Sequence, residues 1–323
     1  MWSSTSFLLP WLSLHDQWDD FEDTRALREL KPDLVLFTGD FGDENVELVH
    51  SISKLNFLKA AILGNHDCWY TAELFSRQDV SPGYSPCKSE CNAVDAQLQS
   101  LQDSHIGYKR MDISELKLSI IGARPFSTGG NTFGPAYGII TQRFGIQGMN
   151  HSAGKISSLA LQAPTGHVLV FLGHNGPTGL GSKPMDICGK DWSAKSSGDH
   201  GDPDLEAALK KVKERGSHNV QLVIFGHMHK TLSLGRGERT MLVRGQDNII
   251  YVNAAVVPRV IAIDASKCHP NNTGLQTFRN FTVIDLNNGQ VEKISETWVR
   301  VGDNVSVDHE HILYSSLTPQ QSV

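Results

Sequence analysis

The sequence predicts an α/β fold with a largely parallel sheet. Four apolar runs, each as long as a buried strand, end in Gly followed by a carboxylate, an amide or a histidine: 33–40 (DLVLFTGD), 60–67 (AAILGNHD), 168–174 (VLVFLGH) and 222–229 (LVIFGHMH). A helical pattern over about 44–55 separates the first two runs, so they form a strand–helix–strand unit. Such units favour parallel strands with right-handed crossovers. In open α/β sheets functional groups gather beyond the carboxyl ends of the strands, so we expect the polar endings to converge.

The N-terminal part of the chain should contribute the first strand. Residues 1–14 should lead as a strand to His15, but Pro10 cannot donate a hydrogen bond to a ladder and belongs on an edge or in a turn. Residues 16–29 resemble a loop that passes into a helix, and 34–37 is apolar throughout, as expected of a buried strand. We therefore predict an atypical or altered first strand over 1–14.

Regular elements alternate along the rest of the chain. The helix at 44–55 places Val46, Val49, Ile52 and Leu55 on one face. Further helices are predicted at about 93–101, 151–161 and 205–215. Further strands are predicted at about 60–63, 106–111, 116–121, 168–172, 220–225, 241–243, 249–253, 260–263, 278–286 and 290–301.

Two long segments between these elements do not have the pattern of regular structure. Residues 122–138 are rich in Gly and Pro, and residues 173–203 are rich in Gly, Asp and Lys. Loops of this length inside compact domains are often functional. After about residue 303 the sequence shows no strong pattern. We therefore predict a single domain over 1–303 and a polar C-terminal tail over 304–323.

The composition is that of an ordinary soluble globular protein. Of the 323 residues, 39% are hydrophobic and 20% are charged, and the formal net charge is −6. Negative net charge argues against a protein whose main role is to grip nucleic acid, so we expect no specific nucleic-acid binding. No apolar run is long enough to cross a bilayer, and no Lys or Arg precedes Arg25, whereas a signal peptide begins with a basic segment. The five cysteines are scattered, which favours reduced thiols. We therefore expect a soluble protein inside the cell, with no membrane partner, in the cytoplasm or a plastid.

The polar strand endings supply oxygen and imidazole ligands suited to divalent metals. These candidates are Asp40, Asn65, His174, His227 and His229. Such a mixed set fits zinc, iron or manganese better than calcium. His227 and His229 are separated by Met228. On an extended backbone this spacing puts both imidazoles on one side and points the methionine into the packing.

Each motif also has a simpler structural explanation. Gly-Asp after a strand is commonly a turn, Asn-His-Asp can form an Asx-turn, and a lone His after a strand is usually a hydrogen-bonded turn residue. These explanations must all hold independently at four strand ends. A shared metal site explains the four endings together, so we favour it.

The chain resembles the calcineurin-like metallophosphoesterases. The motif series of that family runs Asp-x-His, Gly-Asp, Gly-Asn-His-Asp or Gly-Asn-His-Glu, Gly-His, and Gly-His-x-His. In this sequence the series takes the form Ser13-Leu14-His15, Gly39-Asp40, Gly64-Asn65-His66-Asp67, Gly173-His174 and Gly226-His227-Met228-His229. The order and the spacing make the resemblance specific over about 13–229. Longer runs, such as LKPDLVLFTGDFGDENVELV, are similar to a branch found in cyanobacteria and plants.

The resemblance implies a fold and a metal site. The fold would be a sandwich of two mixed β-sheets flanked by helices. The site would hold two divalent ions, which in this family are manganese, iron or zinc. The ligands that the resemblance implies are Asp40 bridging both ions, Asn65, His174 and His227 on one ion, and His15 and His229 on the other.

The resemblance also implies an activity. A hydroxide that bridges the two metals would hydrolyse a phosphomonoester or a phosphodiester, and nucleotides are among the small phosphoesters that would fit this chemistry. His66 would not bind metal. It would lie beside the substrate, oriented by Asp67, and would stabilise phosphoryl charge or protonate the leaving oxygen. Arg124 is a candidate phosphate clamp because of its fork-shaped donors, and the alternative is a solvated loop residue.

The first motif departs from the family pattern. Ser13 stands where the family has Asp, and a neutral hydroxyl is a poor ligand for a dication. Asp16 cannot replace it, because it neighbours His15 and on a strand points to the other face. We therefore expect the ion between His15 and His229 to be weakly bound or absent and the activity to be reduced. The alternative function is that of a catalytically impaired homologue, which binds a phosphorylated ligand or a partner through the remaining metal.

Overall fold

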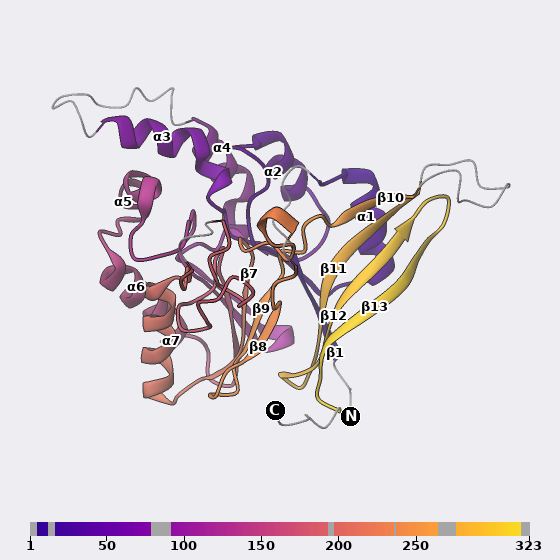
Figure 1. Cartoon of the computed structure of the whole chain (residues 1–323). Coiled ribbons are helices and arrows are strands. Elements are labelled where there is room, and N and C mark those ends of the chain that lie inside the picture. Colours follow the sequence, from indigo (N-terminus) through magenta and orange to yellow (C-terminus); the bar gives the residue numbers. More distant parts are fainter. Residues whose placement is uncertain are drawn as a thin grey trace.

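The chain forms two mixed β-sheets packed face to face, with helices on their outer sides (Figure 1). The computed structural model describes residues 5–11, 17–78, 92–192, 197–235, 237–263 and 276–317. Among these residues no helix is long and apolar enough to cross a membrane. The architecture confirms the expected α/β sandwich of two mixed sheets.

The first sheet combines a parallel part with an antiparallel part. Its strands follow one another in the order β13 (Val305–Ser315), β12 (Gln290–Val301), β11 (Gln276–Asn287), β1 (Thr5–Trp11), β2 (Leu34–Phe37) and β3 (Lys59–Ala61), with β10 (Val260–Ile263) paired to β11. Strands β1, β2 and β3 are parallel neighbours. Strands β11, β12 and β13 form an antiparallel meander, which Figure 1 shows as the long strands at one side of the molecule.

The second sheet is parallel in its centre. Its strands follow one another in the order β4 (Arg110–Ile113), β5 (Leu118–Gly122), β6 (Val168–Leu172), β7 (Asn219–Phe225), β9 (Ile250–Asn253) and β8 (Leu242–Arg244). Strands β5, β6, β7 and β9 are parallel, and the outer strands β4 and β8 pair antiparallel. Strands β2, β3, β6 and β7, whose polar endings the sequence singled out, therefore all lie in parallel parts of the two sheets.

Alternate residues of the central strands supply the core between the sheets. Leu34 and Leu36 of β2 join Val170 of β6 and Ile224 of β7 in one apolar cluster. The residues between them, such as Phe37, face the other way and pack in the layer that includes the helices. Because these strands are buried on both faces, they are apolar throughout, as the sequence suggested.

The helices cover the outer faces of the sheets. Their bounds are α1 (Asp20–Leu30), α2 (Val46–Ser53), α3 (Trp69–Gln78), α4 (Asn92–Leu101), α5 (Tyr137–Phe144), α6 (Met149–Leu161) and α7 (Pro203–Arg215). Short 3₁₀ turns occur at His66–Cys68, Gln102–Ser104, Ser114–Leu116, Gly134–Ala136 and Ser233–Gly235. Helix α1 contacts β12 and β13, whereas α6 contacts α7 and β5. Figure 1 shows α5, α6 and α7 on the side away from the long meander.

Helix starts follow local hydrogen bonding. The Asp19 carboxylate accepts a hydrogen bond from the Glu22 N–H at 2.8 Å, and the Asn45 side chain accepts one from the Leu48 N–H at 3.0 Å. These caps satisfy amide groups that have no partner within the helix. They fix where α1 and α2 begin, close to the predicted positions.

Three elements differ from the sequence prediction. Helices α3 and α5 form where no helix was predicted, and residues Val305–Ser315 form β13 instead of an irregular tail. Side chains over much of β13 are exposed, so the strand lacks the apolar alternation that marks a half-buried strand. Its partner β12 holds it in the sheet through a long antiparallel register.

The first strand forms with Pro10 inside it, at a point where the strand is paired on one side only, as at the edge of a sheet. Strand β1 lies between β11 and β2. Its pairing with β11 ends at Leu8, and from there to Trp11 it has a neighbour only in β2. Proline is tolerated where one side of a strand needs no donor. His15 and Ser13 lie outside the described residues.

Candidate metal centre

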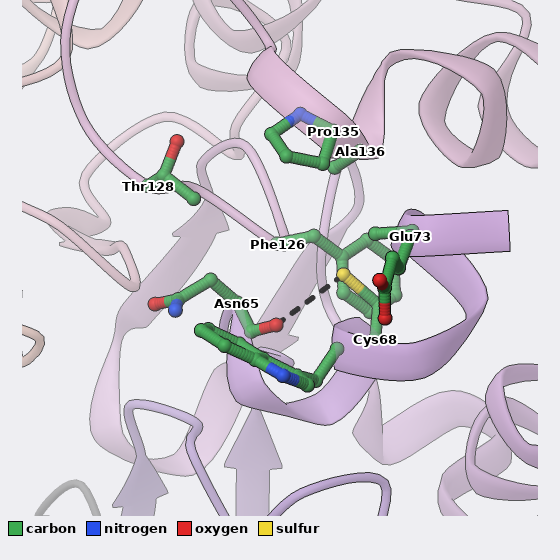
Figure 2. A pocket seen from close by; sticks show the side chains of 9 residues that line it. Asn65, Cys68, Glu73, Phe126, Thr128, Pro135 and Ala136 are labelled. Carbon is green, nitrogen blue, oxygen red and sulfur yellow. Dashed lines mark hydrogen bonds between the residues drawn. The ribbon is translucent and has the colours of Figure 1, made fainter. Parts of the chain in front are cut away.

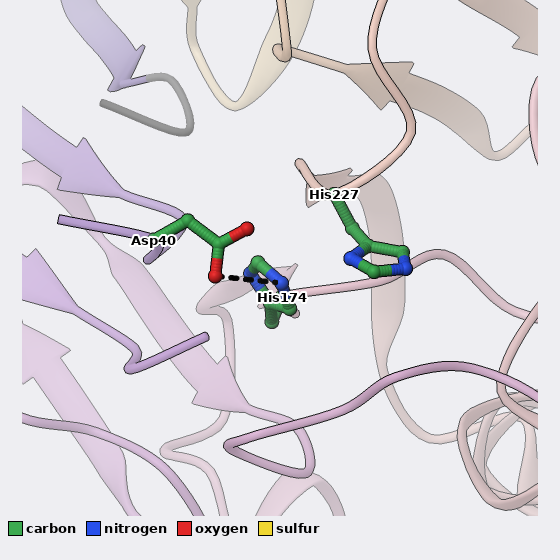
Figure 3. Close-up of side chains that lie close together, drawn as sticks. All are labelled: Asp40, His174 and His227. Atoms are coloured by element: carbon green, nitrogen blue, oxygen red, sulfur yellow. Dashed lines mark ion pairs between the residues drawn. The ribbon is translucent and has the colours of Figure 1, made fainter. Parts of the chain in front are cut away.

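Residues that follow four different strands meet at one edge of the sandwich. Asp40 comes after β2, Asn65 after β3, His174 after β6 and His227 after β7. An oxygen of Asp40 and one ring nitrogen each of His174 and His227 lie within 4.8 Å of one another (Figure 3). The expected convergence of the polar endings is thus present for these residues.

The Nε2 atom of His174 points toward Asp40 and Asn65. Its Nδ1 lies 2.6 Å from the carbonyl oxygen of Thr38, which can only accept, so Nδ1 carries the proton. In the neutral ring Nε2 is then an acceptor, and it lies 3.4 Å from Asp40 Oδ1 and 3.0 Å from Asn65 Oδ1. Three acceptor atoms therefore lie close together, an arrangement that a cation between them would stabilise.

His227 is suited to the same role. Burial, and after it the neighbouring His174, lowers the pKa of His227 well below its ordinary value. Its imidazole is therefore neutral at pH 7, the form that can bind a metal. The centre thus fits a divalent ion of the zinc, iron or manganese type by its chemistry.

The backbone approaches this centre unusually closely. Asp40 has a φ of 55° and His227 a φ of 64°, which non-glycine residues rarely adopt and which concentrate at functional sites. A Cβ on Gly64 would overlap the Asp40 carboxylate and the His174 ring. Gly64 therefore allows Asp40 and His174 to come together.

Asp67 supports the backbone of the centre and does not orient His66, so that part of the prediction was wrong. Its carboxylate accepts hydrogen bonds from the N–H groups of Gly64 at 2.6 Å, Phe41 at 2.8 Å and Asp40 at 2.9 Å. Burial, and then the charge of Asp40, raises the pKa of Asp67 well above its ordinary value. These bonds tie the loop after β2 to the loop after β3 and stabilise the positive φ at Asp40.

Asp43 is the residue that orients His66, and the sequence analysis did not identify it. Asp43 Oδ1 lies 2.6 Å from His66 Nδ1. The ring also stacks on Trp69, with 4.8 Å between the centroids and 13° between the planes. The signal available in the sequence was only the position of Asp43, three residues after Asp40.

His229 lies at the mouth of the centre. It lines a cavity of about 320 Å³ together with Asp40, His66 and His227. Met228 between the two histidines is 2% exposed and points into the packing. The left-handed φ of His227 shows that the backbone is not extended there, so strand alternation is not the reason for this arrangement.

Arg124 does not fit a phosphate clamp or a solvated loop residue. Its side chain is fully buried, with Nη2 2.6 Å from Asp202 Oδ1 and Nε 3.2 Å from Asp204 Oδ2. These ion pairs anchor the loop after β5 to the first turn of α7. The carboxylate of Asp202 also accepts from Ser127 Oγ at 2.6 Å. Arg124 is therefore part of the scaffold beneath the loops.

Some solved structures are similar to this chain at low sequence identity. A dimetal phosphatase from Danio rerio has a similar structure, with 11% identity over 96% of this chain and 99% of that chain and a TM-score of 0.45. Phosphopantetheinyl hydrolase from Mycobacterium tuberculosis shares 11% identity over 79% of this chain and 91% of that chain, with a TM-score of 0.41. No curated protein matches the sequence.

A protein-family comparison reaches most of the chain. The family described as calcineurin-like phosphoesterase matches residues 14–231, which include the polar endings of all four strands. The chain belongs to the calcineurin-like phosphoesterase family of metal-dependent phosphoesterases.

Proposed function

We propose that this chain hydrolyses phosphomonoesters or phosphodiesters at a two-metal site built on Asp40. The observation that carries the proposal is the convergence of acceptor atoms from Asp40, Asn65 and His174. In the proposed site Asp40 would be shared by two divalent ions. The remaining ligands are Asn65, His174 and His227 on one ion, and His229 with His15 on the other.

The bound ions and the chain would divide the chemistry between them. When bound, two divalent cations would neutralise phosphoryl charge and lower the pKa of a bound water. The chain supplies the positioning. Because Asp43 accepts from His66 Nδ1–H, we assign proton donation to the leaving oxygen to the opposite ring nitrogen, Nε2, in the imidazolium form of the ring.

The test of this function is a panel of phosphoesters on the full chain. The protein is stripped with a chelator and reloaded separately with manganese, zinc or iron. The panel contains phosphomonoesters, phosphodiesters and nucleotides. We expect hydrolysis of at least one class with a reloaded metal and none in its absence. Failure to hydrolyse any of them with any of the three metals would overturn the proposal.

A second candidate function follows from Ser13. With Ser in the place of the first-motif Asp, the ion at His15 and His229 would lose one anionic ligand and keep only the carboxylate that it shares, Asp40. In this alternative the chain is a catalytically impaired homologue that binds a phosphorylated ligand or partner. The discriminating experiment is Ser13→Asp: a large gain in hydrolysis would show that the present chain is disabled. Two ions tightly bound per chain without the substitution would exclude the impaired form.

A further inference from the structure

An apolar cavity of about 310 Å³ adjoins the metal centre (Figure 2). The two sites share Asn65, whose side chain reaches His174 in the centre and whose residue also lines the cavity. In Figure 2, Pro135 and Ala136 lie on one side of the cavity and Asn65, Cys68 and Glu73 on the other. The cavity and the metal centre therefore lie next to each other, on either side of Asn65.

The walls of the cavity are suited to an uncharged group. Trp69, Ala72, Phe126, Pro135 and Ala136 supply most of the lining. Among the described residues that line it none is basic, and Glu73 is acidic. From the described part of this lining, a second phosphate would therefore meet a carboxylate and no basic side chain. An apolar occupant would instead remove these walls from water, which is favourable.

The aromatic residues indicate a flat occupant. Trp69 is 48% exposed although it is a large apolar side chain next to a cavity. Phe126 is fully buried at the cavity wall. Aromatic rings favour stacked or edge-to-face contact with other rings. The volume is at the lower end of that found for ligand sites, which suits one ring system with a short linker.

We propose that this cavity binds the alcohol part of the phosphoester and that this part is an uncharged aromatic group on a short linker. The inference rests on the proposed phosphoesterase function. His66, which stacks on Trp69, would then lie near the bond between phosphorus and the alcohol oxygen. Trp69 thus stacks on His66, which would protonate the leaving oxygen, and also lines the cavity that would hold the leaving alcohol.

The experiment compares 2-phenylethyl phosphate with ethyl phosphate on the full chain reloaded with manganese. The two leaving alcohols have similar acidity, so a difference in rate reports recognition of the phenyl ring. We expect kcat/KM to be at least about tenfold higher for 2-phenylethyl phosphate, mainly through a lower KM. Equal kcat/KM for the two esters would overturn the inference and leave the proposed function standing.

Two substitutions place a phenyl ring in the cavity. Ala136→Phe fills it from the 3₁₀ turn, and Thr128→Phe fills it from a partly exposed position that disturbs folding less. In both variants the ratio of kcat/KM for 2-phenylethyl phosphate to kcat/KM for ethyl phosphate should fall close to one. Gln142→Phe is the matched control, because it adds the same ring on the exposed side of α5, and it should keep the wild-type preference. An unchanged preference in Thr128→Phe would contradict the assignment.

A binding measurement separates the inference from the proposed function. Saturation-transfer NMR on the full chain should show transfer to the phenyl protons of 2-phenylethyl phosphate, and Thr128→Phe should abolish it. If neither these two esters nor any phosphoester of the panel is hydrolysed with any of the three metals, the proposed function fails while this transfer still supports a ring-binding cavity. Absence of transfer in the wild-type chain overturns the cavity assignment whatever the hydrolysis result.

Discussion

At the scale of single residues, the orientation of His66 depends on Asp43. Asp43 Oδ1 lies 2.6 Å from Nδ1, and in the proposed site the opposite nitrogen, Nε2, is the proton donor. We expect Asp43→Asn to lower kcat about tenfold to a hundredfold, as is usual for groups that orient a functional histidine. Removal of the ring in His66→Ala should lower kcat about 10²–10⁴-fold. Metal content, measured by mass spectrometry, should not change in either variant.

The control for Asp43 is another carboxylate in an exposed pair. Asp95, which binds Arg143 on the surface, can be changed to Asn without touching the centre. Asp95→Asn should keep the wild-type kcat. If Asp43→Asn raises KM and leaves kcat unchanged, Asp43 contributes to binding and does not orient the proton donor.

Gly64 carries a second prediction at this scale. A Cβ there would overlap Asp40 and His174, so Gly64→Ala should push the two ligands apart and lower metal occupancy. Gly154→Ala is the matched control. It lies inside α6, its added Cβ meets nothing within 4 Å, and the change should stabilise the helix by about 0.5–1 kcal/mol. Metal content and thermal unfolding measure both effects. Full occupancy in Gly64→Ala would contradict the close-approach explanation.

The sequence predicted the residues of the centre better than their supports. Asp40, Asn65, His174 and His227 follow apolar runs, and parallel strands bring such endings together. Asp43 and Asp67 could not be assigned in this way. Their partners depend on how the loop after β2 turns toward the loop after β3, and the spacing of residues in the sequence does not show this.

At the scale of elements, a buried ion-pair cluster holds the loop after β5 against α7. Arg124 lies between Asp202 and Asp204, and all three side chains are almost completely buried. Arg124→Met should leave two carboxylates without their counter-ion and lower the free energy of unfolding by about 3–5 kcal/mol. Urea unfolding followed by circular dichroism measures the loss.

Arg143→Met is the surface counterpart of this variant. Arg143 pairs with Asp95 in a partly exposed position, and its loss should cost less than about 1 kcal/mol. Equal destabilisation by the two substitutions would show that the Arg124 cluster contributes no more than a surface pair. The sequence could not identify the cluster, because Arg124 and Asp202 are 78 positions apart.

Elements were predictable where the apolar pattern was strong. Strands β2 and β6 and helices α6 and α7 lie close to their expected positions. Helix α3 was missed because it begins directly after the Gly-Asn-His-Asp turn and continues into a polar stretch. Strand β13 was missed because its pairing with β12, and not an apolar face, holds it in the sheet.

At the scale of the whole molecule, the order of strands decides which residues meet. The sequence indicates parallel neighbours within a strand–helix–strand unit, such as β2 and β3, because the connection is local. It does not show that β1 lies between β2 and β11, because β1 and β11 are at opposite ends of the chain. The centre therefore draws its residues from both sheets of the sandwich, with Asp40 and Asn65 from one and His174 and His227 from the other.

Acid stability is a property of the whole fold that one buried histidine should influence. His105 is 1% exposed, and its Nε2 has no hydrogen-bond partner among the described residues. Burial, and then the charge of Lys109, lowers the pKa of His105 to about 3. In the unfolded chain the pKa of a histidine is about 6.5, so between these values the unfolded state binds the extra proton.

The stabilisation at His105 is therefore complete above about pH 6.5 and is lost as the pH falls toward 3. Between pH 7 and pH 4 this group alone should remove roughly 3 kcal/mol from the free energy of unfolding. His105→Gln should lower the free energy of unfolding at pH 7. It should also reduce the difference in that free energy between pH 7 and pH 4. His50→Gln, at an exposed position in α2, should leave that change as in the wild type. Urea unfolding at both pH values measures the difference, and an equally steep loss in His105→Gln would show that other groups cause the acid sensitivity.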